Sequence, residues 1–162
     1  MVLFTAFGRR LLGEMTRRLG WESKPEEEHL TKLLRSLLLG RMAMFDDPEV
    51  IAEAERRFTA HVERGEPIQA DFRSTVYKAV LRSGSRTAYD ALLRIYREAT
   101  LHEEKDRVAS ALGTIRDEAM LREVLTFAMS SEVRSQDTVF VISSVTSSRL
   151  CRDLAWNYLH DN

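Results

Sequence analysis

Hydrophobic residues recur along this chain at intervals of three and four, the period of an α-helix with one apolar face. A leucine-rich segment shows this period on one face: Leu30, Leu33, Leu34, Leu37 and Leu38. The N-terminal segment repeats it with larger side chains: Phe4, Phe7, Leu11 and Met15. Similar segments follow one another to the end of the chain. The pattern therefore predicts a protein built from consecutive amphipathic helices.

Short polar residues and glycines mark the predicted helix ends. Asp47 before Pro48, Ser85 and Asp117 have the character of N-caps, and Ser23 with Glu26 has the spacing of a capping box. Asp71 is a further predicted N-cap. Glycine is favoured at the position that follows a helix. Gly20, Gly65 and Gly84 therefore predict helix ends. Helices are expected to start near residues 26, 48, 71, 86, 102, 117, 137 and 149.

The segment after Asp137, TVFVISSVTSS, is ambiguous because its β-branched residues suit a buried strand as well as a helix. A lone strand among helices would leave its backbone donors and acceptors without partners. We therefore interpret this segment as a helix.

The spacing of the predicted helices indicates the fold class. Taken in pairs, the units recur roughly every 30 to 45 residues, the range of helical repeats. No residue-level repeat accompanies the spacing, and the linkers are short. We predict an all-α fold, an irregular α-solenoid of antiparallel helix pairs forming a HEAT- or armadillo-like superhelix. Residues 1–162 are predicted to form a single helical-repeat domain.

Charge and cysteine content narrow the possible partners. The 162 residues include 24 Lys and Arg against 25 Asp and Glu, a net charge of −1. Such a balance gives no general attraction to nucleic acid or an anionic membrane, and no segment approaches the ~20 apolar residues of a membrane span. We expect neither as a partner. Cys151 is the only cysteine, so nothing indicates a disulfide or an oxidising compartment.

The first 20 residues are rich in Arg and poor in acids, as in a mitochondrial presequence. Their apolar residues precede the arginines, which is the wrong order for a secretory signal. The helical spacing of the apolar residues favours an amphipathic first helix instead.

The segment His102-Glu103-Glu104-Lys105-Asp106 is the best candidate for catalytic chemistry. Zincin peptidases place H-E-x-x-H on a helix so that two imidazoles share one face. Here Asp106 replaces the second His, and no further ligand lies at a suitable spacing. We interpret the segment as a charged first helical turn and predict no metal in this chain. Cys151 beside Arg152 is interpreted as an inert packed thiol.

Three stretches together resemble a known family. They are Leu19-Gly20-Trp21 with the leucine-rich helix at 30–39, the segment DFRSTVY over 71–77, and the long run from Glu104, which contains LTFAMSSEVRSQD and ends in CRDLAWNYLHDN. In order and spacing they resemble the C-terminal helical, HEAT-like domain of the gluzincin zinc aminopeptidases, closest to the puromycin-sensitive branch. Two features depart from the family pattern: Cys151 stands where a glycine is usual, and the connection before it is short.

This resemblance implies a function. In such cytosolic enzymes the helical domain encloses a cavity over the zinc site and helps to bind peptides whose N-terminal residues the catalytic domain removes. The zinc and exopeptidase motifs belong to that separate domain, so we expect the present chain to be inactive alone and to be part of a larger domain. Its expected partners are peptides and the catalytic domain of the same protein.

The resemblance also points to particular residues. Arg134 and Gln136, in the R-x-Q-D segment, are the predicted peptide-facing pair, with the guanidinium suited to a carboxylate and the amide to a peptide backbone. Arg73 and Tyr77 are weaker candidates of the same kind. The alternative for the first pair is helix capping by Ser135 or Asp137.

Two further expectations concern partners. The alternative function is a free-standing helical-repeat scaffold that binds proteins through its concave face. On the last helix, Leu150, Leu154 and Leu159 are expected to pack on the preceding helix, whereas Trp156 and Tyr158 point elsewhere. An exposed aromatic pair predicts self-association through the C-terminal end.

Overall fold

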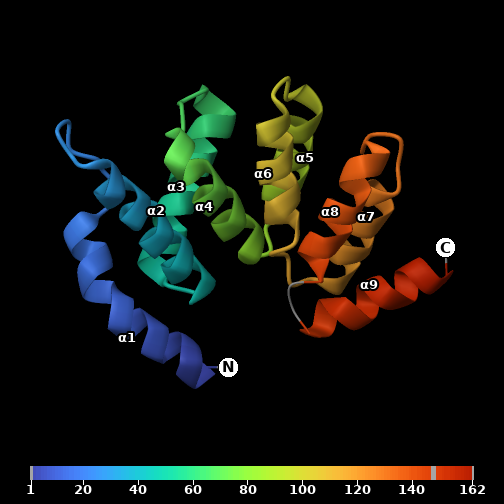
Figure 1. The fold of residues 1–162 in the computed structure, drawn as a ribbon, viewed down its shortest axis with the longest axis horizontal. Coiled ribbons are helices and arrows are strands. Elements are labelled where there is room, and N and C mark those ends of the chain that lie inside the picture. Colours follow the sequence, from blue (N-terminus) through green and yellow to red (C-terminus); the bar gives the residue numbers. More distant parts are fainter. Residues whose placement is uncertain (1, 147–148, 162) are drawn as a thin grey trace. The chain divides into compact units, whose positions relative to one another are not determined.

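The computed structural model describes residues 2–146 and 149–161, and within these ranges it is all-helical, with nine helices and no strand (Figure 1). The helices are α1 (Val2–Leu19), α2 (His29–Met44), α3 (Pro48–Arg64), α4 (Ala70–Arg82), α5 (Arg86–Glu98), α6 (His102–Leu112), α7 (Glu118–Ala128), α8 (Ser135–Val145) and α9 (Arg149–Asp161). The predicted all-α class is confirmed, and the ambiguous segment after Asp137 is helical. None of the described helices combines the length and apolar character that crossing a bilayer requires.

The chain divides into two compact units, and the boundary lies inside α4, between Ala79 and Val80. In the first unit α1 packs on α2, and α2 packs on α3. In the second unit α6 contacts α5 and α8, while α7 contacts α8 and α9. Contacts between helices that are one or two apart in sequence are typical of helical-repeat proteins.

Three predicted N-caps are confirmed. The Asp47 carboxylate accepts a hydrogen bond from the backbone N–H of Val50 at 3.0 Å, and Ser85 and Asp117 cap α5 and α7 in the same way. The left-handed φ of +69° at Gly65, which ends α3, is a conformation that glycine adopts without strain.

The predicted capping box before α2 is wrong. Helix α2 begins at His29, three residues later than expected, and its N-cap Glu28 makes no side-chain cap. Ser23 is engaged elsewhere, because its Oγ accepts a hydrogen bond from Nη1 of Arg35 at 3.1 Å. Asp71 is also misassigned as a cap, since α4 begins at Ala70 and Asp71 lies in its first turn.

Arg35 holds the connection between α1 and α2. It is 1% exposed, and its Nε donates to the carbonyl oxygen of Leu19 at 3.1 Å. Its guanidinium also forms a two-pronged ion pair with Glu27, with Nη2 2.5 Å from Oε1. Hydrogen bonding from Arg35 lowers the pKa of the Glu27 carboxyl. A charge buried in this way is stable only when fully paired, so this cluster determines the path of residues 20–28.

The apolar stripes that predict α1 and α2 are largely exposed in the described residues. Of the five leucines in the predicted α2 stripe only Leu38 is buried, and Leu30 is 73% exposed. The helix itself is confirmed, but its buried side is formed by another set of residues: Arg35, Leu38, Leu39, Met42 and Ala43.

The second unit has a continuous apolar core. Helix α5 buries Ala88, Tyr89, Ala91, Leu92, Leu93 and Tyr96. Helices α6 and α8 approach closely at Gly113, where an added Cβ would lie 2.1 Å from the backbone oxygen of Ser144. The Ser144 hydroxyl donates to the carbonyl of Ala109 at 3.0 Å, which strengthens the same contact.

The last helix differs in part from its prediction. Leu154 is buried and Trp156 is 71% exposed, as expected. Tyr158, however, is half-buried, and its hydroxyl donates to Thr126 Oγ1 on α7 at 3.3 Å. Leu159 is 45% exposed instead of packed. The side chain of Leu150 lies outside the described residues.

Candidate functional site

A cluster of charged side chains in the second unit contains the first predicted site residue, Arg134. This residue occupies the N-cap position of α8, and His102 is the first residue of α6. Nη2 of Arg134 lies 2.8 Å from Nδ1 and 2.5 Å from Nε2 of His102. Its Nε donates to Oδ2 of Asp137 at 2.7 Å. The cluster therefore joins the beginnings of α6 and α8.

Two carboxylates complete the surroundings of His102. Its Nε2 lies 3.3 Å from Oδ1 of Asp106 and 3.5 Å from Oδ1 of Asp137. Nε2 therefore faces both carboxylates and the guanidinium, and in the neutral ring the unprotonated nitrogen is the one that accepts from Arg134. Hydrogen bonding from Arg134 holds the pKa of the Asp137 carboxyl below its ordinary value. Asp137 is therefore ionised at neutral pH and orients the guanidinium.

A buried aromatic ring lies next to this cluster. Tyr96 from α5 is 3% exposed, with Lys105 Nζ 5.1 Å from the centre of its ring and Phe127 in edge contact. Burial, and after it the charge of Asp137, raise the pKa of Tyr96, so its hydroxyl remains protonated at neutral pH. Lys105 thus places a cation over the buried ring of Tyr96, close enough to the cluster for the charge of Arg134 to act on the Tyr96 hydroxyl.

Gln136, the second predicted residue, lies in the first turn of α8. It is exposed, and its side chain makes no hydrogen bond with any described residue. Neither Ser135 nor Asp137 is the N-cap, because Arg134 occupies that position and no side chain caps the helix. The capping interpretation of this segment is therefore wrong.

Arg73 and Tyr77 lie in the first unit, whereas Arg134 lies in the second. Arg73 is half-buried, and its Nε donates to the carbonyl oxygen of Ile68 at 3.2 Å. Tyr77 is 1% exposed and makes an edge contact with Phe58, at 6.1 Å between ring centres. Their role in peptide binding stays a prediction.

Metal-binding geometry is not found in the described part of the chain, where no three His, Cys, Asp or Glu side chains are grouped to hold an ion. His102 with its two carboxylates is bound by Arg134 instead. This partnership was missed from sequence because the two residues are 32 positions apart and only tertiary packing brings them together. Cys151 is buried, as its interpretation as a packed thiol requires.

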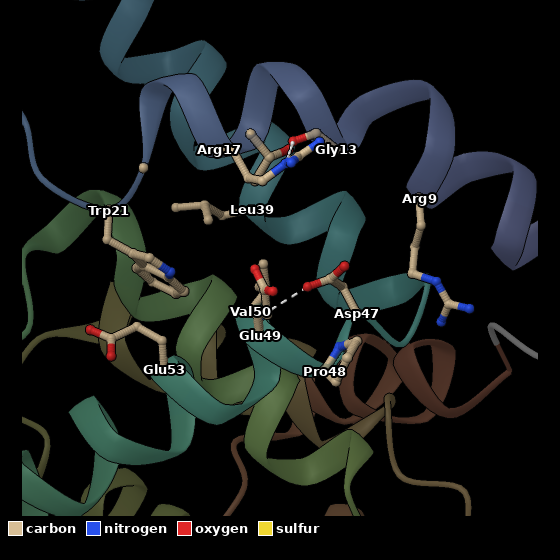
Figure 2. Close-up of a pocket in the computed structure, with 12 residues that line it drawn as sticks. Arg9, Gly13, Arg17, Trp21, Leu39, Asp47, Pro48, Glu49, Val50 and Glu53 are labelled. Atoms are coloured by element: carbon tan, nitrogen blue, oxygen red, sulfur yellow. Dashed lines mark hydrogen bonds between the residues drawn. The ribbon is translucent and has the colours of Figure 1, made fainter.

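The first unit contains a pocket of about 530 Å³ (Figure 2). One wall is formed by α1, with Arg9, Gly13, Thr16 and Arg17, and the other by the start of α3, with Asp47, Pro48, Glu49 and Glu53. Leu39 and Val50 form the apolar floor between them, and Trp21 closes one end. Sequence reasoning did not identify this site.

Comparison with known proteins places the fold in a family. The family described as ERAP1-like C-terminal domain matches residues 2–162. The chain belongs to this family. This ERAP1-like C-terminal domain is 36% identical over 149 residues to aminopeptidase M1 of Arabidopsis thaliana, covering 89% of the chain and 17% of the relative. It is 27% identical over 146 residues to glutamyl aminopeptidase of Rattus norvegicus, covering 89% and 15% respectively.

The predicted resemblance to an aminopeptidase C-terminal domain is thus confirmed. The chain spans less than a fifth of the relatives it matches. The closer likeness to the puromycin-sensitive branch stays a prediction. The names of these relatives do not favour the alternative of a free-standing scaffold.

Proposed function

We propose that this ERAP1-like domain is the non-catalytic helical part of a cytosolic zinc aminopeptidase, enclosing the peptide cavity and holding the distal part of the substrate. The observation that carries the proposal is the family match over residues 2–162, together with relatives such as aminopeptidase M1 and glutamyl aminopeptidase, which are much longer than the chain. Zinc and the bond-breaking chemistry belong, on this proposal, to a separate catalytic domain.

Arg134 is the residue best suited to hold a substrate carboxylate. Asp137 and His102 fix its Nε and Nη2, while Nη1 donates to no described residue. Its side chain is 56% exposed. A guanidinium oriented on one side and free on the other is preorganised for a charge-assisted hydrogen bond. Gln136 lies two residues after Arg134, in the first turn of α8, and its side chain, which has no hydrogen-bond partner among the described residues, can bind peptide backbone.

Exposed apolar surface in the first unit supports a role within a larger helical array. The exposed large hydrophobic residues of α1 and α2 are Leu3, Phe4, Phe7, Leu11, Met15, Leu30, Leu33, Leu34, Leu37 and Met44. Helical repeats bury such faces against neighbouring repeats. We infer that further helices of the whole enzyme cover this surface.

The test is a substrate-length comparison in the enzyme that joins this domain to its catalytic domain. Arg134→Ala should raise KM about tenfold for peptides of eight or more residues, the loss of one charge-assisted hydrogen bond. Single-residue amide substrates should keep their KM, because they do not reach this cluster. Arg122→Ala is the matched control, since Arg122 is also an exposed arginine with one carboxylate partner, Glu118.

An equal rise of KM for long and short substrates would contradict the proposed role of Arg134. The assignment of catalysis to another domain has its own test. The purified 162-residue chain should hydrolyse no aminoacyl substrate and should contain no stoichiometric zinc by metal analysis. One tightly held zinc per chain would overturn that assignment.

A further inference from the structure

The pocket between α1 and α3 in the first unit has oppositely charged walls and an apolar floor. Two arginines line it on the α1 side and three acids on the α3 side (Figure 2). Leu39 and Val50 are 1% and 6% exposed, so the floor is part of the core of this unit. The pocket lies in a different unit from the Arg134 cluster, and the inference drawn from it is independent of the proposed function.

Three of the five charged groups that line this pocket already have fixed hydrogen-bond partners. Asp47 caps α3, and Glu53 accepts hydrogen bonds from Arg56 and Arg57, each at 2.7 Å. Arg9 donates from Nη1 to the carbonyl oxygens of Phe45 and Asp46 at 3.0 and 2.9 Å. These groups shape the walls without needing a ligand.

Two charges remain available. Arg17 uses only Nε, which donates to the carbonyl oxygen of Gly13 at 3.3 Å, and its terminal nitrogens bind no described residue. Glu49 makes neither a hydrogen bond nor an ion pair within the described ranges. Although they line the same pocket from opposite walls, these two residues do not pair with each other. The pocket thus offers one cation and one anion across an apolar floor.

We propose that this pocket binds a zwitterionic short peptide, a di- or tripeptide with an apolar side chain. Its carboxylate pairs with Arg17, its ammonium group with Glu49, and its side chain packs on Leu39, Val50 and Trp21. A zwitterionic ligand follows from the two charges, because a simple anion would pair with Arg17 and leave Glu49 unpaired. A simple cation would do the reverse. The size also fits: small-ligand pockets begin at about 300 Å³, and an extended dipeptide spans about 7 Å.

The binding test uses Trp21 as the reporter. The sequence has two tryptophans, so the Trp156→Phe chain reports only the residue that borders the pocket. The probe is the dipeptide Ala-Leu, compared with its C-terminal amide and with its N-acetyl derivative. Ala-Leu should change the fluorescence saturably, and each blocked derivative should bind about tenfold more weakly, having lost one charge-assisted hydrogen bond.

Two substitutions assign the charged groups. Arg17→Gln should weaken Ala-Leu about tenfold and remove the preference over the amide, while Glu49→Gln should remove the preference over the N-acetyl form. Arg18→Gln and Glu55→Gln are the controls, since both residues are exposed on the same two helices and do not line the pocket.

Equal affinity for the three compounds, or no saturable signal with Ala-Leu up to about 10 mM, would overturn the proposal; the latter limit corresponds to binding weaker than about 3 kcal/mol. The three-compound comparison needs no substitution in the pocket, so a folding defect in a variant cannot decide the outcome.

Discussion

Helices α2 and α5 have the same apolar period, but only α5 buries its apolar face. Leu92 on α5 is fully buried, whereas Leu30 on α2 is 73% exposed. Helix α5 lies in a unit where α6 packs on it and α8 packs on α6 in turn. The buried side of α2 is centred instead on Arg35 and Leu39. An apolar stripe therefore predicts a helix, but its burial depends on which elements pack around it.

The two units also hold their helices by different means. In the first unit, Arg35 joins Leu19, Ser23 and Glu27 through buried polar contacts. In the second, Gly113 allows the backbones of α6 and α8 to come into direct contact. The first arrangement depends on complete pairing of a charge and the second on the absence of a side chain. Substitutions can test each separately.

The largest effect is expected at Arg35. Arg35→Ala should lower the free energy of unfolding by about 3–5 kcal/mol, because it removes a buried guanidinium and leaves its partners unpaired. Denaturant unfolding followed by circular dichroism measures the loss. Arg41→Ala, an exposed arginine on the same helix, should change stability by less than about 0.5 kcal/mol. Similar losses for both variants would show that Arg35 is not the central contact.

The contrast between the apolar faces predicts the next largest effect. Leu92→Ala should destabilise the chain by about 3 kcal/mol, since it opens a cavity in the second unit. The same substitution at Leu30 should change stability by less than about 0.5 kcal/mol. Equal losses of unfolding free energy for the two variants would contradict the difference in burial between α2 and α5.

Gly113→Ala should destabilise the chain by about 2 kcal/mol, because its Cβ would collide with the backbone of Ser144. Gly13→Ala makes the same change within α1, where the added Cβ meets only Met42 Cε at 3.9 Å. Alanine is the better helix former, so this control should raise stability by about 0.5–1 kcal/mol. A loss of stability at both glycines would argue against a specific close contact in the second unit.

A smaller, pH-dependent effect is expected in the first unit. The hydrogen bond from Arg56 lowers the pKa of Glu53 from 4.5 to about 2. A carboxyl whose pKa is lower in the folded state contributes stability that is present above about pH 4.5 and is lost as the pH falls toward 2. We expect Glu53→Gln to remove about 1 kcal/mol of acid sensitivity, an amount reduced by solvent screening. Unfolding curves at pH 6, 4 and 2 measure it, with Glu55→Gln as the control.

The smallest effect concerns association rather than folding. Trp156 on α9 is 71% exposed, and we predict that the chain self-associates through this region at micromolar concentration. Light scattering after size exclusion should show that Trp156→Glu restores a monomer. A chain that becomes monomeric with Leu30→Glu but not with Trp156→Glu would place the association surface on α2 instead.

Much of the fold could be predicted from local patterns. Asp47, Ser85 and Asp117 cap their helices because a short polar side chain reaches the first free N–H groups whatever lies further away. The helical state of the segment after Asp137 was predictable by the same kind of argument, since a strand without partners is unstable. The family could be predicted from the order of its motifs along the chain, because that order is kept when residues between the motifs are substituted.

The site could be predicted only in part. The sequence pointed to Arg134 and Gln136, which lie at the N-cap and in the first turn of α8, and their role in peptide binding stays a prediction. It did not pair Arg134 with His102, nor Arg17 and Glu49 with a common pocket. These pairs of residues come together only because of how the helices pack. A local sequence pattern carries no information on that packing.

The amino-acid sequence by itself determined that the chain is helical, where most helices begin and end, and to which family it belongs. Period, caps and glycines act within a few residues, so they are readable without the fold. Only the tertiary structure decided that Arg35 is buried while Leu30 is exposed, and that His102 meets Arg134. Burial and charge pairing depend on neighbours that are distant in sequence. Such neighbours exclude Arg35 from water and make it a structural residue, which its residue type alone does not indicate.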